Sequence, residues 1–126
     1  MTEPIISSDQ RDALSVLAYL YLRFGHFHNA AKLLLALDQL DPGSVWARHA
    51  RCLALLRAGN CQEAAAEAGR LLVPALDNDD RFLILQVRVK AFWKLGLKSE
   101  ARACQRLVAT LLKQAALQGA SRGRAV

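Results

Sequence analysis

Histidines and cysteines are the side chains in this sequence that could bind a transition metal, and there are three of each. His26 and His28 are two residues apart, so on a helix they would point in different directions. His49 and Cys52 lie one helical turn apart, but no second pair completes the four ligands of a structural metal site. We therefore predict no metal site and interpret the cysteines as small apolar residues of a core.

Acidic residues cluster at positions 77–80, where the sequence reads DNDD. This density of carboxylates is similar to that of a calcium site, but the stretch lacks the spacing and the terminal Glu of an EF-hand loop. We interpret it as a solvated loop with an Asp that starts a helix. The sequence also has no phosphate-binding Gly-rich loop, nucleophile elbow or carboxylate pair in an apolar setting, so we expect neither catalysis nor a cofactor.

The chain has 126 residues, enough for one domain with its own core. Apolar residues make up 53% and charged residues 22%, which argues against disorder, and the few Gly and Pro beside many Ala and Leu favour an all-helical protein. The longest uncharged apolar stretch, 14–22, is shorter than the roughly 20 residues that span a membrane. No signal peptide is visible and three cysteines give no disulfide framework, so we expect a cytoplasmic protein without stable membrane insertion.

One short pattern, a Gly followed five residues later by an Ala, occurs three times in the chain. The glycines are Gly25, Gly59 and Gly96, which are 34 and then 37 residues apart. Gly is expected where a helix ends in a left-handed residue, and Ala where two helices approach closely. A helix–turn–helix unit with a period of 34 residues is typical of tetratricopeptide repeats.

The first repeat matches the tetratricopeptide pattern almost completely, whereas Arg48 and Arg51 replace large apolar residues in the second. Three extra residues precede the third repeat, and we place them in a loop that contains Pro74. We expect a single domain over 1–118, folded as a short right-handed superhelical array of three helical hairpins, and a disordered basic tail over 119–126. The predicted helices cover residues 9–23, 27–40, 44–57, 61–73, 80–94 and 98–117.

The concave face of such an array is lined by the first helix of each hairpin. The register of the three glycines places mainly aromatic and aliphatic side chains on this face. An apolar groove of this kind suits a partner segment that inserts hydrophobic side chains, either a helix or an extended strand. The alternative is that the two tryptophans pack between repeats or under the last helix. The predicted groove residues are Tyr19, Leu22, Trp46, His49, Leu53, Leu56, Lys90 and Trp93.

Positive charge is concentrated in the C-terminal third. Residues 1–80 carry a net charge of −3 and residues 81–126 a net charge of +9, which together give the +6 of the chain. We predict a basic stripe on the last helix, either a second binding surface or only a solvated face. Aromatic residues are not interleaved with it as single-stranded nucleic-acid binding favours, so we expect no nucleic-acid partner. The stripe consists of Lys98, Arg102, Arg106 and Lys113.

The stretch from Arg23 to Leu72 resembles the SctY (YscY-type) chaperones of bacterial type III secretion systems. The likeness lies in the Gly25-His26 turn, the Leu-rich helix that ends in Leu40-Asp41-Pro42, and the helix over 47–56 with its Ala, Arg and Cys residues. This resemblance implies a cytoplasmic chaperone that binds a small exported protein, SctX, keeps it soluble and delivers it to the export gate protein SctV at the inner membrane.

Other functions stay open at this point. A needle-subunit chaperone of the SctG type is also similar to tetratricopeptide proteins and would bind a polymerising needle protein. The translocator chaperones form a third class but are usually longer at the N-terminus. A self-assembling scaffold without an exported client is the remaining alternative. All of them predict binding without catalysis, and they differ in the partner.

Overall fold

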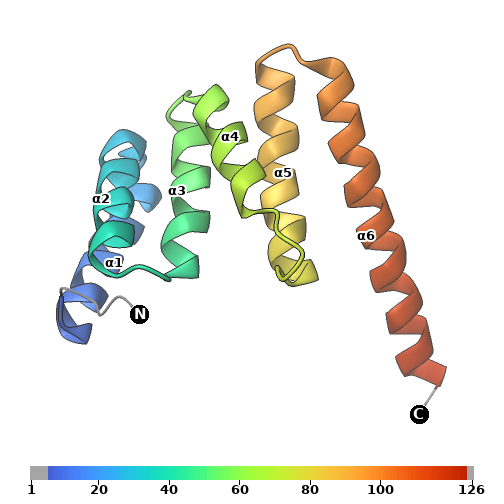
Figure 1. Cartoon of the computed structure of the whole chain (residues 1–126), viewed down its shortest axis with the longest axis horizontal. Coiled ribbons are helices and arrows are strands. Elements are labelled where there is room, and N and C mark those ends of the chain that lie inside the picture. The colour runs from blue at the N-terminus through green and yellow to red at the C-terminus, as the bar shows by residue number, and fades with distance from the viewer. Residues whose placement is uncertain (1–5, 125–126) are drawn as a thin grey trace. The chain divides into compact units, whose positions relative to one another are not determined.

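The computed structural model describes residues 6–124 (Figure 1) and contains no strand within them. The protein is all-α, as predicted from its composition and periodicity. Five of the six predicted helices agree with the structure to within about two residues at each end, the usual uncertainty of a helix boundary. The helices are α1 (Ser8–Arg23), α2 (Phe27–Leu40), α3 (Val45–Arg57), α4 (Cys61–Leu71), α5 (Asn78–Lys94) and α6 (Lys98–Arg124).

The three repeated glycines end α1, α3 and α5 in the same way. Their φ angles are +82° at Gly25, +89° at Gly59 and +77° at Gly96, in the left-handed region that favours glycine. At the first of these turns His26 N donates to Tyr21 O at 2.8 Å and Gly25 N donates to Leu22 O at 3.3 Å. This pair of bonds is a Schellman motif, and the other two turns form the same pair. The sequence repeat is therefore also a repeat of backbone geometry.

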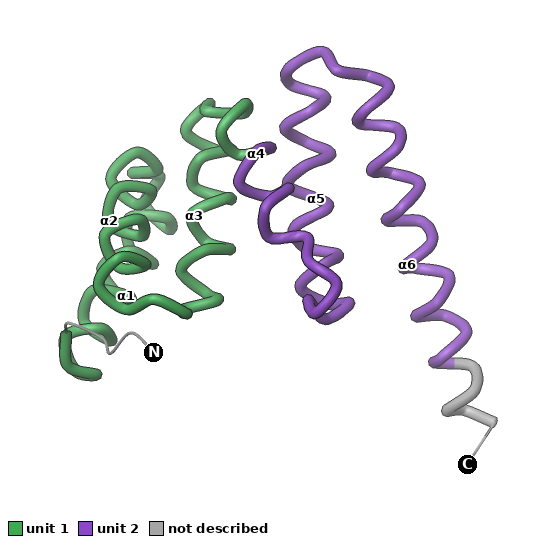
Figure 2. The backbone as a smooth tube through the Cα atoms, in the orientation of Figure 1, with its two compact units in different colours: residues 1–64 green, residues 65–126 purple. Residues whose placement is uncertain are grey.

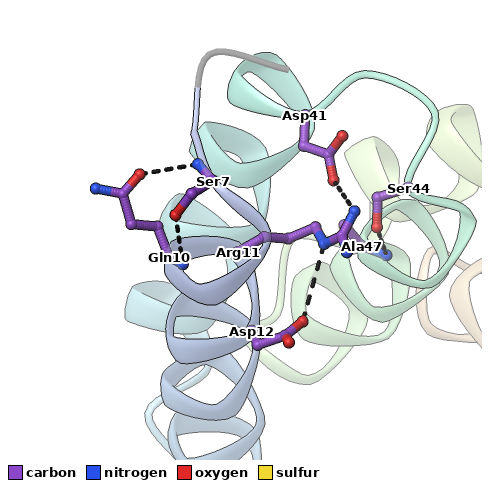
Figure 3. Close-up of polar contacts among 7 residues, drawn as sticks. All are labelled: Ser7, Gln10, Arg11, Asp12, Asp41, Ser44 and Ala47. Carbon is purple, nitrogen blue, oxygen red and sulfur yellow. Dashed lines mark hydrogen bonds and ion pairs between the residues drawn. The ribbon is translucent and has the colours of Figure 1, made fainter. Parts of the chain in front are cut away.

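Side-chain caps fix the starts of three helices. Ser7 and Gln10 form a reciprocal capping box before α1 (Figure 3), and Ser44 Oγ accepts a hydrogen bond from Ala47 N at the start of α3. Asp77 Oδ1 accepts from Asp80 N at 2.8 Å and caps α5. The acidic cluster thus starts a helix, as the sequence predicted.

The chain divides into two compact units, residues 1–64 and residues 65–126 (Figure 2). The division falls inside α4, between Ala64 and Ala65. The prediction of a single domain over 1–118 rests on the repeat pattern, which continues across this point, and it stays a prediction. A repeat period reports the unit that recurs and does not indicate how the repeats group into compact units.

Unit 1 packs α1 against α2 and α2 against α3. Small residues at the helix contacts allow this close packing, since Ala18, Ala30 and Ala47 are completely buried. An ion pair between Arg11 of α1 and Asp41, the C-cap of α2, adds a polar connection: Arg11 Nη1 lies 3.3 Å from Asp41 Oδ2 (Figure 3). Asp41 is the buried charged residue of the described core.

Unit 2 is built around the antiparallel pair of α5 and α6. Its core consists of Leu85, Val89, Cys104 and Val108, with Leu72, Phe82, Phe92 and Leu111 packed around them. The loop before α5, where the sequence has its extra residues, is held by Arg81. The guanidinium of Arg81 donates to Val73 O at 2.7 Å and to Leu76 O at 3.1 Å. A side chain of α5 therefore fixes the enlarged connection.

The last helix is longer than predicted. It was expected to end at residue 117, with a disordered tail over 119–126, but α6 continues to Arg124. A single glycine costs a helix only about 1 kcal/mol relative to Ala, and the Ala and Leu residues before Gly119 favour helix. Gly119 therefore lies within α6 and does not end it, and residues 125–126 lie outside the described part of the chain.

Candidate binding surfaces

The three aromatic residues of the predicted groove are exposed. Tyr19 on α1, Trp46 on α3 and Trp93 on α5 have between 39% and 51% of their surface accessible. Each of them lies on the first helix of its hairpin. Their exposure places them outside the buried core. Trp46 and Trp93 thus keep 44% and 39% of their surface accessible.

The remaining groove residues differ in burial. Lys90 is exposed, whereas Leu22, His49 and Leu53 are half-buried. Leu56 is only 3% exposed, so its assignment to the groove is wrong and it belongs to the buried core.

Leu56 is buried because α3 is covered over more than one narrow stripe of its surface. Ala54, Leu55 and Leu56 are consecutive, and all three are buried. A helix with a single apolar stripe would leave one of three consecutive residues exposed. The predicted register came from the repeated glycines, which give no information on this wider burial, and it therefore placed Leu56 in the groove.

The predicted groove residues are divided between the two units. Tyr19, Leu22, Trp46, His49 and Leu53 belong to unit 1. Lys90 and Trp93 belong to unit 2. Each unit therefore carries its own exposed aromatic residues and can be tested separately.

Unit 2 also has an open apolar groove of about 410 Å³ between the first turns of α5 and the C-terminal half of α6. Leu83 and Leu112 on its two sides are each more than half exposed. This α5–α6 groove was not predicted from the sequence. The sequence feature that indicates this groove is the apolar periodicity of residues 111–115. These residues belong to α6, which is ten residues longer than α5. The groove is lined by Asn78, Asp79, Phe82, Leu83, Leu111, Leu112, Ala115 and Gln118.

Arg88 is a half-buried cation inside unit 2. Its guanidinium carbon lies 5.0 Å from the centre of the Phe92 ring, and the guanidinium also packs against Gly69 of α4. Its Nε is buried and has no hydrogen-bond partner among the described residues. Burial raises the pKa of Cys104, and the positive charge of Arg88 partly opposes this effect. Arg88 therefore packs against Phe92 and Gly69, and its positive charge partly offsets the rise in the pKa of Cys104.

All four residues of the basic stripe are exposed along α6. They lie on roughly the opposite side of the helix from the buried Ala101, Cys104 and Val108. No carboxylate within the described part of the chain is paired with one of them in a salt bridge. The stripe is thus a concentrated positive surface that an acidic partner could approach.

The cysteines and histidines do not converge on a centre. Cys52, Cys61 and Cys104 are buried. Among residues 6–124, no group of three or more His, Cys, Asp or Glu side chains is arranged to hold a metal ion. No helix in the same range is long and apolar enough to cross a membrane. Compared with known proteins, the chain matches no protein-family model and no curated protein.

Proposed function

We propose that this protein is a cytoplasmic chaperone of a type III secretion system, which binds a small exported protein of the SctX kind. The observation that carries the proposal is the exposure of Tyr19, Trp46 and Trp93, one on the first helix of every hairpin. Large exposed aromatic residues are typical anchors of protein interfaces, where a few of them supply most of the binding free energy. The resemblance of residues 23–72 to SctY chaperones supports the choice of client.

The mechanism is protection of apolar surface. An exported protein must remain unpolymerised and soluble before export, and its hydrophobic side chains are the source of aggregation. Aromatic residues on α1 and α3 would cover one apolar segment of the client. The α5–α6 groove, with Phe82, Leu83 and Leu112 in its walls, would take further aliphatic side chains of an amphipathic helix.

The basic stripe has a separate role in this proposal. Its exposed cations are suited to an acidic patch on the client or on the SctV-like export gate. Exposed ion pairs contribute little affinity, about 0–1 kcal/mol each. They act mainly on the rate of association and on orientation. We assign the stripe to delivery at the inner-membrane export apparatus and the apolar surfaces to holding the client.

Co-expression tests the identity of the client. The chain would carry an affinity tag and be produced with one of three partners: a SctX-like protein, a needle subunit, or none. The proposal expects a stable complex with the SctX-like protein and a soluble client that aggregates without the chaperone. Selective retention of the needle subunit would instead identify a SctG-type chaperone. A closed oligomer of the chain that retains neither client would identify a scaffold.

A matched pair of substitutions tests the α5–α6 groove. Leu107 and Leu112 are both on α6 and both 54% exposed, but only Leu112 lines the groove. Leu112→Glu should weaken client binding at least tenfold, because it places a charge against an apolar client segment. Leu107→Glu should leave binding within about twofold, as is usual for a neutral contact. Equal effects of the two substitutions would exclude the groove as a client site.

A further inference from the structure

Helix α1 has an exposed apolar face that no part of the proposed client site uses. Its buried side, which includes Ala18, faces the interior of unit 1. The other side carries an α1 stripe of large apolar residues that are between 40% and 70% exposed. Contiguous apolar surface of this kind on a soluble protein marks an interaction site. The α1 stripe consists of Val16, Leu17, Leu20 and Phe24.

The positions of these residues make one continuous surface. At about 100° per residue, the four side chains lie within an arc of about 100°, and Ala18 is about 150° from its centre. Tyr19 lies about 115° from the same centre, so the α1 stripe is separate from the aromatic residue assigned to the client. The stripe runs over two turns of α1 and reaches the C-cap residue Phe24.

The charges beside the α1 stripe are self-complementary. Asp12 lies near its N-terminal end and Arg23 near its C-terminal end, and both are exposed. At about 100° per residue they fall on the same side of the stripe, within about 20° of each other. Among the described residues, Asp12 makes a loose contact with Arg11 Nε at 3.9 Å. When two identical helices pair antiparallel about a two-fold axis, the same sides of both helices meet, with the N-terminal half of one beside the C-terminal half of the other. Asp12 of each copy then approaches Arg23 of the other.

We propose that the α1 stripe binds the α1 stripe of a second copy of this chain, antiparallel and about a two-fold axis. The apolar residues would form the centre of the interface, and two Asp12–Arg23 pairs would fix its direction. The acid and the base at opposite ends of one side favour a second copy of the same helix as the partner, because the two-fold antiparallel arrangement brings each acid beside a base. This inference does not depend on the identity of the client.

Light scattering on the purified full chain tests the dimer. Measured after size-exclusion chromatography from about 1 to 100 µM, the mass should rise from one copy to two, because interfaces of modest size dissociate in this range. Val16→Glu should leave the chain monomeric with unchanged helix content, and Phe24→Gln should weaken the dimer at least tenfold. Leu107→Glu, on a similarly exposed leucine of α6, is the matched control and should remain dimeric. A wild-type chain that stays monomeric at about 100 µM overturns the proposal, as does a dimer that Val16→Glu and Phe24→Gln leave intact.

A charge swap tests the antiparallel arrangement. Asp12→Arg alone or Arg23→Asp alone should raise the dissociation constant of the dimer roughly tenfold, because each pair occurs twice in a two-fold interface. The double variant, with both substitutions in one chain, should return the constant to near the wild-type value. This rescue distinguishes a direct pairing from damage to α1. A double variant that dimerises no better than the single variants would contradict the antiparallel pairing.

Discussion

Arg88 of α5 fills the space that a side chain at Gly69 of α4 would need. A Cβ atom at Gly69 would lie 3.1 Å from Arg88 Nη2 and 3.3 Å from Arg88 Cζ, closer than ordinary contact. The same guanidinium lies against the ring of Phe92. Gly69 has a lower helix propensity than Ala would have in α4. Because it has no side chain, the guanidinium of Arg88 can pack against it.

This relationship predicts that the effect of Gly69→Ala depends on Arg88. In a helix Ala is more favourable than Gly by up to about 1 kcal/mol. With Arg88 present, Gly69→Ala should gain clearly less than this, because the guanidinium must move. In an Arg88→Met background the full gain in the free energy of unfolding should appear. Urea denaturation of the four proteins measures the difference, and equal gains in both backgrounds would show that the contact has no energetic effect.

The ion pair between Arg11 and Asp41 should stabilise unit 1. Arg11→Ala leaves the buried carboxylate of Asp41 without this partner, so we expect a loss of about 1–2 kcal/mol in the free energy of unfolding. The matched control is Arg48→Ala, since Arg48 pairs with a more exposed acid, Asp38, at 2.9 Å. This control should cost less than about 1 kcal/mol. A loss from Arg11→Ala no larger than that of the control would contradict the assignment.

The buried thiol of Cys104 predicts a loss of stability at high pH. Burial raises the pKa of Cys104 in the folded protein, so the native state retains a proton that the unfolded chain has released. The stabilising contribution is complete below the unfolded pKa of about 8.5 and is lost as the pH rises toward the folded pKa. Between about pH 8 and 10 the free energy of unfolding should fall more steeply for the wild type than for Cys104→Ala. Identical slopes would mean that the thiol does not titrate differently on folding.

The basic stripe should affect delivery more than client binding. Reversal of Arg102 and Arg106 to Glu should leave the helix content and the client affinity nearly unchanged, because both side chains are exposed on α6. Association with the export gate should become slower and lose its dependence on salt. Stopped-flow association and a secretion assay on the same variant separate the two effects. Normal secretion by the reversed protein would identify the stripe as a solvated face.

The helix boundaries were largely predictable because local chemistry decides them. Gly25, Gly59 and Gly96 can adopt the left-handed conformation that ends a helix, and Ser44 and Asp77 supply the caps that start one. These signals lie within a few residues of the boundary they set. The end of α6 was missed because Gly119 alone does not provide the hydrogen bonds of a C-cap.

Tertiary features were less predictable. The repeat register predicts that Leu56 is accessible. It is buried because α3 is covered on more than one side. The α5–α6 groove depends on the different lengths of two helices, which a repeat of equal hairpins does not indicate. Nor did the repeat indicate the division inside α4. Each of these features depends on contacts between residues far apart in the sequence.

The most direct test of the proposed chaperone function is the affinity of the chain for a SctX-like client, measured by calorimetry for the wild type and for Trp46→Ala. Removal of an aromatic anchor that becomes buried in the complex costs about 2 kcal/mol or more, so the dissociation constant should rise at least about 30-fold. The control is Val45→Ala, at an exposed neighbour on α3, which should change it less than threefold. Circular dichroism should show the same helix content in all three proteins. An unchanged affinity of Trp46→Ala, or no binding by the wild type, would contradict the account.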